Sequence, residues 1–540
     1  MHVNSDPDFA RTGRPLSNRS DGTGHDGVNE GNMVTKAGKP GNIQPFPMEG
    51  VERDERGVLG YTSLPSSLVE VLRAAVAADP GGEALVEVGG ERATYQEYWD
   101  RATRVAGGLR DAGVERGDRV AILLPNGNDW AYAFFGILMA GGVVVPVNTR
   151  FAPPEIDYVL TDSGTTVAIR PEDPLPDGEP FVLDPQPSDL AGIFYTSGTT
   201  GFPKGAMTTQ ENFLSNCETC CRVIGIDEPP TFRNLISVPM FHVTGCNSQL
   251  LLTAYVGGTC VIMPAFEPQA FLQTIRDEQI NVVTSAPAIL WLAMNQENFG
   301  DFDMSAVEWV TYGGAPTAPD VIARIRDSFP NAALGNGFGL TETSSVSTFL
   351  PDEWCERRPE TVGFAAPVVE LDLDDEDPDT GVGELLIRGQ NVVAGYWNKP
   401  EQTAETFVDG WLHTGDLARI DDDGFVQIVD RMKDMVNRGG ENVYCVEVEN
   451  ALVQHPDVFE VAVVGVPDAM MGEKVGAIVV PRPGRTIDPR ELRDFVSDQL
   501  ADFKVPQFVA VREEPLPRNP GGKVLKPELR SGTEWGAQLR

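Results

Sequence analysis

Short apolar runs alternate with longer amphipathic segments from about residue 64 onward, and this alternation constrains the fold more than any other feature. Residues 67–78 and 95–112 have the apolar spacing of helices, and 132–140 is also helical. Residues 119–124 and 142–147 are short apolar runs typical of buried strands. Strands that alternate with helices in this way form mostly parallel sheets covered on both faces. The sequence therefore predicts an α/β protein.

The character of the chain changes at both ends. Residues 1–58 are rich in Gly, Asp, Asn, Ser and Pro and lack hydrophobic periodicity, so we expect a disordered extension, with Met33 and Met48 as alternative start sites. After residue 367, the runs 369–373 and 383–388 are typical of a smaller β-rich unit. The last 105 or so residues alternate again between helices and strands. A chain of 540 residues is long enough for two or three such cores.

Composition narrows the class of protein. The net charge of −38 argues against a nucleic-acid partner, because phosphate contacts need clustered Lys and Arg. It predicts either a solubilising surface or adaptation to high salt. The longest apolar stretch, 134–147, is too short to span a bilayer, and no secretory signal precedes it. Seven cysteines, an odd number, favour a reducing, cytoplasmic location, and Cys217-x-x-Cys220-Cys221 lacks the second ligand pair of a zinc site.

One loop carries phosphate-binding chemistry. Residues 195–205 read Tyr-Thr-Ser-Gly-Thr-Thr-Gly-Phe-Pro-Lys-Gly, with three hydroxyls and two glycines between Thr196 and Gly201, followed by Lys204. Glycine permits the backbone conformations that turn several N–H groups toward one phosphate. The loop follows an apolar run and precedes a helical run from about Thr209, and anions are commonly held between a strand and a helix. Its Lys is followed by Gly205, so it is not the common G-x-x-x-x-G-K-[ST] loop.

This loop resembles the phosphate loop of the adenylate-forming superfamily, which includes acyl-CoA synthetases. Four further stretches resemble the family's motifs and occur in its order. They are Phe338-Gly-Leu-Thr-Glu-Thr343, His413-Thr-Gly-Asp416, Asp430-Arg-Met-Lys-Asp-Met435 with Gly439-Gly-Glu-Asn442, and Asn519-Pro-Gly-Gly-Lys523. The resemblance covers about residues 60–540.

The resemblance implies a domain organisation. Residues 59–432 would form a large N-terminal adenylation domain, with layered, mostly parallel sheets and a β-rich subdomain. Residues 433–540 would form a small, mobile α+β lid domain, hinged at Lys433, with the site in the cleft between the two. Lys433, Arg438, Gly439, Gly440 and Glu441 would lie at the hinge and line the path for CoA. We hypothesise that Arg438, which stands where serine is common in the family, contacts a CoA phosphate.

The resemblance also implies an ATP site and a catalytic set. Lys523 would bridge the carboxylate and the α-phosphate, a role that suits the compact charge of lysine. Glu342 would hold Mg²⁺ with Thr196, Thr341 would contact the phosphates, and Asp416 with Arg431 would bind the ribose. Phe338 stands where the family often has tyrosine, which keeps stacking on adenine but loses a hydroxyl. The other ATP- or AMP-binding residues would be Ser197, Gly198, Thr199, Thr200, Gly201, Lys204, Gly314, Ala315, Pro316, Gly337 and Gly339.

His242 bears on the substrate. In the family it would lie near the acyl pocket, where relatives that activate amino acids generally have aspartate, so amino-acid activation becomes a minor alternative. A purely structural role for this histidine remains open. Val243, Gly314 and Val346 would line the same pocket and suit an apolar acid.

The implied reaction joins a fatty or aromatic carboxylic acid to AMP with release of pyrophosphate, then transfers the acyl group to CoA. ATP, Mg²⁺ and CoA would be required. One alternative is an acyl-AMP ligase that loads a separate carrier protein, and another is a non-catalytic adenylate-binding protein. The sequence leaves the acid and the oligomeric state open, although homodimers are common.

Overall fold

The structure, a computed structural model, describes residues 38–39, 41–196, 203–226, 231–315, 317–439, 441–468, 470–518 and 524–539. Its central element is a nine-stranded sheet. The six strands β14, β13, β12, β10, β11 and β3 are parallel. At the edges, β15 pairs antiparallel with β14, β16 antiparallel with β15, and β4 antiparallel with β3. Their bounds, in sheet order, are β16 (Phe364–Ala365), β15 (Thr348–Leu350), β14 (Ala333–Phe338), β13 (Trp309–Gly313), β12 (Val282–Ser285), β10 (Arg233–Ile236), β11 (Thr259–Ile262), β3 (Glu83–Glu87) and β4 (Arg92–Thr94).

A second sheet holds the predicted phosphate loop. Its order is β7 (Thr165–Ile169), β5 (Arg119–Ile122), β6 (Val143–Pro146), β8 (Leu190–Thr196) and β9 (Lys204–Thr209). The first four strands are parallel, and β9 pairs antiparallel with β8. The buried strands and intervening helices that the sequence predicts in this region are confirmed.

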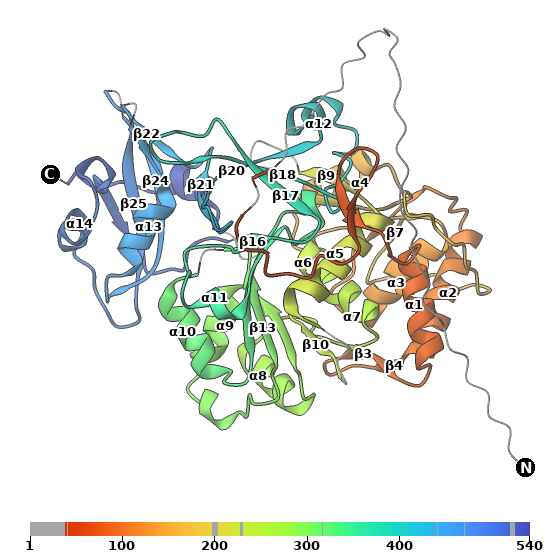
Figure 1. Cartoon of the computed structure of the whole chain (residues 1–540). Coiled ribbons are helices and arrows are strands. Elements are labelled where there is room, and N and C mark those ends of the chain that lie inside the picture. Colours follow the sequence, from red (N-terminus) through yellow and green to blue (C-terminus); the bar gives the residue numbers. More distant parts are fainter. Residues whose placement is uncertain are drawn as a thin grey trace, which may run out of the picture. The chain divides into compact units, whose positions relative to one another are not determined.

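Helices cover both sheets, and Figure 1 shows α8, α9 and α10 beside β13. One core cluster contains residues of helices α1–α3 and of strands from both sheets, such as Val120 and Leu85. The helices are α1 (Leu68–Ala78), α2 (Tyr95–Asp111), α3 (Asn128–Met139), α4 (Pro153–Ser163), α5 (Gln210–Ile224), α6 (Val243–Gly245), α7 (Leu252–Tyr255), α8 (Pro268–Asp277), α9 (Pro287–Met294), α10 (Pro319–Ser328), α11 (Asp352–Cys355), α12 (Pro400–Thr406), α13 (Cys445–Val453), α14 (Pro489–Ser497) and α15 (Lys526–Gly532).

Local chemistry explains several helix starts. The Ser67 hydroxyl accepts a hydrogen bond from the Glu70 N–H and caps α1. Thr94 and Glu97 form a capping box at the start of α2, and the Thr209 hydroxyl caps α5. These caps fix where each helix begins relative to the preceding strand or loop.

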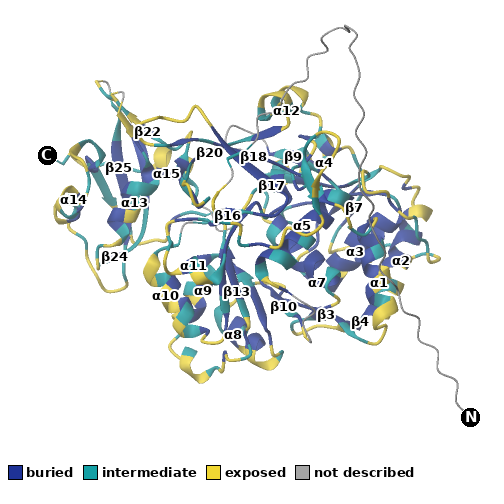
Figure 2. Ribbon diagram, in the orientation of Figure 1, coloured by how far each residue is buried: buried dark blue, intermediate teal, exposed yellow. Residues whose placement is uncertain are grey.

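An antiparallel sheet and a mostly antiparallel sheet, in which β26 pairs parallel with β25, follow the large α/β region. The β-rich unit comprises β17 (Val369–Asp374), β18 (Gly383–Gly389), β19 (Phe407–Val408), β20 (Trp411–Ile420) and β21 (Val426–Arg431). The C-terminal sheet comprises β22 (Val436–Arg438), β23 (Glu441–Val443), β24 (Val458–Asp468), β25 (Gly472–Pro481) and β26 (Phe508–Val511), packed with α13 and α14 around its own core. This mixed architecture is the predicted one. Figure 2 shows the sheet strands mostly buried, with exposed residues concentrated on loops and outer helix turns.

The structure differs from the expected disorder of residues 1–58 within its described part. A two-stranded ribbon joins β1 (Val51–Arg53) to β2 (Leu59–Tyr61). Phe46 is buried and contacts Phe349 edge to face, and Arg53 pairs with Glu370. Scattered anchors of this kind leave no hydrophobic periodicity, which is why sequence patterning did not reveal them. Residues 1–37 and residue 40 lie outside the described residues.

Candidate active site

The predicted phosphate loop lies at the tip of a hairpin. Thr196, the last residue of β8, pairs with Lys204, the first residue of β9. Ser197, Gly198, Thr199, Thr200 and Gly201 lie outside the described residues. The expectation of a loop between a strand and a helix is wrong, because β9 intervenes before α5 begins at Gln210. The described residues that follow the loop therefore form a strand, with Lys204 at its start, rather than the N-terminus of a helix.

Lys204, Tyr396 and Glu342 come together beside the hairpin. The Lys204 Nζ lies 4.8 Å from the centre of the Tyr396 ring, and the Tyr396 hydroxyl donates a 2.7 Å hydrogen bond to Glu342 Oε1. Burial and then the Glu342 charge raise the pKa of Tyr396, so the phenol stays protonated and remains a donor. Two backbone hydrogen bonds attach the segment around Tyr396 to β9. The Met207 N–H donates to the Gly395 carbonyl oxygen, and the Trp397 N–H donates to the Gly205 carbonyl oxygen.

Tyr396 is a residue that sequence reasoning missed. It lies between the motifs that resemble the family, in a Gly-Tyr-Trp stretch that follows β18. Its only sequence signal is an aromatic pair after a strand, which is more often a packing feature. Its long-range contacts place it beside two predicted site residues, Lys204 and Glu342.

The Thr341–Glu342 segment forms a tight turn after β14. A single 3₁₀ turn, η3 (Thr341–Thr343), carries both side chains. Gly339 allows the close approach this turn needs, because a Cβ there would lie 1.4 Å from the Ser345 carbonyl oxygen. The Asn391 side-chain amide also donates to the Thr343 carbonyl oxygen, at 3.2 Å. The turn is therefore fixed from several sides.

Residues at the ends of β13 and β14 lie beside this turn. Gly313 pairs with Gly337, and a Cβ on Gly313 would lie 2.1 Å from the Gly337 carbonyl oxygen. Gly314 follows with φ of +77°, a conformation that favours glycine. Ala315 follows Gly314, and Pro316 lies outside the described residues. The two predicted adenine-contacting segments, around 314 and 337, are thus adjacent at the carboxyl ends of parallel strands, where ligands bind in such sheets.

Asp416 and Arg431 face each other on neighbouring strands. They are register partners on β20 and β21, and the Arg431 Nε lies 2.9 Å from Asp416 Oδ1. The Asp416 side chain is only 3% exposed, whereas that of Arg431 is 33% exposed. Burial distinguishes this pair from an ordinary surface ion pair and holds the carboxylate in one orientation.

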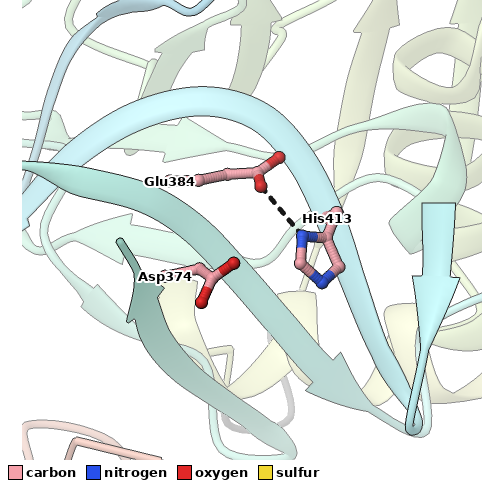
Figure 3. A group of neighbouring side chains, drawn as sticks. All are labelled: Asp374, Glu384 and His413. Carbon is pink, nitrogen blue, oxygen red and sulfur yellow. Dashed lines mark hydrogen bonds and ion pairs between the residues drawn. The ribbon is translucent and has the colours of Figure 1, made fainter. Parts of the chain in front are cut away.

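Asp374, Glu384 and His413 gather on three strands of the β-rich unit, and their ligand atoms lie within 4.8 Å of one another (Figure 3). Among the described residues, these three side chains form a group whose geometry could hold a metal ion. Glu384 accepts from His413 Nδ1 at 2.8 Å and from the Gly415 N–H at 2.9 Å. Both carboxylate oxygens are therefore engaged in fixing the turn that leads to Asp416, which explains the cluster without a metal.

His242 caps the short helix α6. Its Nδ1 accepts from the Thr244 N–H at 3.3 Å and lies 3.2 Å from the Thr244 hydroxyl. Burial lowers the pKa of His242, so its neutral form is favoured. With Nδ1 accepting, the proton of the neutral ring is on Nε2, which can donate a hydrogen bond. Val243 is buried directly after it, and Val346 is half-buried beyond the Thr341–Glu342 turn.

The predicted hinge residue Lys433 lies between the β-rich unit and the C-terminal sheet, and the predicted CoA residues Arg438 and Glu441 lie on the first two strands of that sheet. Lys433 sits in the turn after β21, where burial lowers its pKa. Arg438 ends β22 and pairs in register with Glu441 of β23, and Gly439 has φ of +65°. The buried Arg438 Nε has no hydrogen-bond partner among the described residues.

Two predicted residues of this region, Gly440 and Lys523, lie outside the described residues. The nearest described lysine in sequence is Lys526, whose Nζ pairs with Glu449 Oε1 at 2.8 Å.

The seven cysteines are free thiols, and five of the six that are buried are in the large α/β region. No helix in the described ranges is both long and apolar enough to cross a membrane.

The fold and these motifs define an adenylate-forming enzyme. The family model described as "AMP-binding enzyme" matches residues 72–397, and "AMP-binding enzyme C-terminal domain" matches residues 447–523. The chain therefore belongs to the AMP-binding enzyme family, and its relatives support an AMP-forming acid ligase.

Three similar proteins illustrate the range of named activities among the relatives of this chain. A feruloyl-CoA synthase of Amycolatopsis sp is 37% identical over 470 residues, covering 82% of this chain and 95% of that protein. A fatty acid–[acyl-carrier-protein] ligase, ScoC of Streptomyces coeruleorubidus, is 34% identical, covering 84% of this chain and 93% of ScoC. The solved structure of ATP-bound MatB from Rhodopseudomonas palustris matches with a TM-score of 0.78 at 30% identity, covering 86% of this chain and 98% of MatB.

Proposed function

We propose that this enzyme activates a fatty or aromatic carboxylic acid with ATP, giving acyl-AMP and pyrophosphate, and then transfers the acyl group to CoA with release of AMP. The observation that carries the proposal is the Lys204–Tyr396–Glu342 group beside the tip of the β8–β9 hairpin. It supplies one cation and one fixed carboxylate beside a glycine- and hydroxyl-rich loop. Charge builds up on the phosphates during this reaction, and positioning with cationic and N–H stabilisation accounts for most of its catalysis.

Glu342 fits a magnesium ligand. Its Oε1 accepts from Tyr396, and within the described chain no cationic side chain pairs with its carboxylate. Hard cations prefer such oxygens, and the bound ion would neutralise phosphate charge. Thr196 would supply a hydroxyl on the same side, and Thr341 would donate to the phosphates.

The nucleotide's other parts have matching partners. Asp416 would accept hydrogen bonds from the ribose hydroxyls, with its orientation held by Arg431. Gly314 and Gly337 would let the base approach the backbone closely, and Phe338 would stack on it. Lys523 would bridge the acid and the α-phosphate during adenylation.

The acid would enter beside His242, whose neutral ring suits a carboxyl group close to the attacking thiol. Val243 and Val346 favour an apolar tail. The ligases named above, one for a ferulic and one for a fatty acid, support this breadth of substrate class.

CoA is the proposed acceptor, with Lys433 at the hinge and the 438–441 hairpin entering for thioester formation. The Nε of Arg438 has no hydrogen-bond partner within the described ranges, which supports a contact with a CoA phosphate. An unchanged KM for CoA in Arg438→Ala would contradict that contact. A carrier-protein thiol is the second candidate, since ScoC is named for that acceptor.

A product screen tests the proposal directly. Purified protein is incubated with ATP, Mg²⁺, CoA and a panel of fatty, branched, aromatic and amino acids, and the products are identified by mass spectrometry. We expect acyl-CoA and AMP with at least one fatty or aromatic acid. Acyl-AMP without acyl-CoA would favour the carrier protein, and no AMP with any acid would favour a non-catalytic adenylate-binding protein.

Lys523→Ala separates the two half-reactions. We expect it to lose acyl-AMP formation by a factor of about 100 or more, yet to convert supplied acyl-AMP to acyl-CoA, because the two steps would use different positions of the C-terminal domain. Lys504→Ala is the matched control, because Lys504 pairs with Glu447 in the same domain. Equal loss of both half-reactions would contradict the idea that the C-terminal domain changes position between the two steps.

A further inference from the structure

A π-helix lies directly after the segment of His242. The element η1 (Cys246–Leu251) continues α6, and all six of its residues are buried. π-helical turns are rare and occur often at functional sites, because the extra residue per turn changes the direction of the side chains. Nothing in the proposed reaction uses this element.

Two consecutive side chains of η1 contact the turn that carries Glu342. The Asn247 side-chain amide donates to the Ser344 carbonyl oxygen at 2.8 Å, and the Ser248 hydroxyl lies 2.7 Å from that of Ser345. Both contacts are buried, and each joins residues 97 positions apart in the chain.

Ser344 and Ser345 have unfavourable backbone conformations. Their φ angles are +56° and +120°, in the region that favours glycine, and neither residue is a glycine. Such residues persist only where surrounding contacts hold them, and they cluster at functional sites. Asn247 and Ser248 supply contacts of this kind.

These strained residues close the turn. The Ser345 N–H donates to the Leu340 carbonyl oxygen at 3.2 Å, and the Thr343 hydroxyl donates to the Ser345 carbonyl oxygen at 3.3 Å. The segment between Leu340 and Ser345 contains Thr341 and Glu342. If Ser344 and Ser345 relaxed to ordinary conformations, these two side chains would change direction.

We propose that Asn247 and Ser248 are positioning residues, which hold Ser344 and Ser345 in their strained conformations and thereby fix Thr341 and Glu342 for adenylate formation. The role rests on the proposed function of Glu342. It also connects the acid side of the site, at His242, with the nucleotide side through one short helix.

The first test compares Ser248→Ala with a matched control. Ser248→Ala should lower kcat for acyl-AMP formation at least tenfold and raise the Mg²⁺ concentration needed for half-maximal rate, with KM for the acid changed less than threefold. Ser215→Ala removes another buried hydroxyl, one without a partner among the described residues, and should leave all three unchanged. If Ser248 only lined the acid pocket, KM for the acid alone would change, and this would overturn the proposal.

The second test is rescue by glycine. Adding Ser345→Gly to Ser248→Ala should recover most of the lost rate, because glycine adopts φ of +120° without strain. Adding Ser345→Ala removes the same hydroxyl but keeps the strain, so it should not rescue. Equal rescue by Ser345→Gly and Ser345→Ala would overturn the proposal. So would a failure of both substitutions to rescue the rate in double variants whose melting curves match that of the wild type. A wild-type protein that forms no acyl-AMP would instead contradict the proposed function.

Discussion

At the scale of single residues, the charged groups of the candidate site are each oriented by a neighbour. Glu342 accepts from Tyr396, Asp416 pairs with Arg431, and Glu384 accepts from His413 Nδ1. A buried or half-buried charge is costly unless it is hydrogen-bonded. These partners therefore supply both solvation and direction before any ligand binds.

Tyr396→Phe removes one such partner. We expect about a tenfold rise in the Mg²⁺ concentration that gives half-maximal adenylation, because a hydrogen bond to a charged group contributes about 1.5 kcal/mol or more. Tyr255→Phe is the control, because Tyr255 donates to Glu218 at 2.9 Å in a comparable pair that we do not assign to the site. An unchanged Mg²⁺ dependence in Tyr396→Phe would remove Tyr396 from the site.

The raised pKa of the buried Asp430 side chain should make the free energy of unfolding depend on pH. Burial is the largest influence and raises its pKa to about 6, while hydrogen bonds from the Cys445 and Arg431 N–H groups oppose that shift. The folded pKa lies above the ordinary value of 3.8, so the folded state binds the proton more tightly. This contribution to stability is present at low pH and is lost as pH rises through about 6.

The free energy of unfolding of the wild type, minus that of Asp430→Asn, should accordingly fall by about 1 kcal/mol between pH 5 and pH 7. Urea titrations of both proteins at the two pH values measure this difference. A difference that stays constant or rises with pH would show that Asp430 is ionised throughout.

At the scale of elements, the ends of strands and the turns after them form most of the site. The hairpin tip after β8, the turn after β14 and the β20–β21 pair each present one motif. Rigid strands position these loops, which is the usual arrangement for binding residues. The turn after β14 is closely packed, because a Cβ on Gly339 would lie 1.4 Å from the Ser345 carbonyl oxygen.

Gly339→Ala tests that close packing. A Cβ at Gly339 would lie 1.4 Å from a backbone oxygen, whereas at Gly337, two residues earlier, the nearest atom is a Phe349 side-chain carbon at 3.8 Å. We expect Gly339→Ala to lower the melting temperature by several degrees, since the backbone of the turn must move, and Gly337→Ala to lower it by much less. Similar melting temperatures for the two variants would contradict the geometry of this turn.

Particular elements also show how far the sequence could be interpreted. The helix predicted at 67–78 begins after Ser67, and the strand predicted at 383–388 is β18, because local caps and apolar spacing determine such elements. The strand β9 was not predicted, since Lys204–Thr209 has little apolar periodicity and gains its hydrogen bonds from β8 on one side and the Tyr396 segment on the other.

At the scale of the whole molecule, charge is the dominant property. The net charge of −38 repels anions such as ATP and CoA at long range. In the proposed site, Lys204 and Arg431 are cations that would oppose this repulsion locally. The same repulsion within the protein opposes folding and is screened by salt.

If the acidic surface reflects adaptation to high salt, the melting temperature should rise from low KCl to about 1 M KCl. Screening at that concentration shortens the range of the repulsion between surface charges to about 3 Å. The rise should be smaller at pH 5, closer to the isoelectric point of about 4.4. Thermal melts over a KCl series check this. A flat or falling curve at neutral pH would leave only the solubilising role.

The sequence by itself determined the family, the α/β class and the residues of five motifs, because each motif is a contiguous run whose residue types carry the chemistry. Only the tertiary structure brought Tyr396 to Glu342, 54 positions away, and Ser248 to Ser345, 97 positions away. Such pairs depend on strand order and on which turns adopt strained conformations. Neither property is written in local composition, so the residues that orient the motifs appear only after the chain has folded.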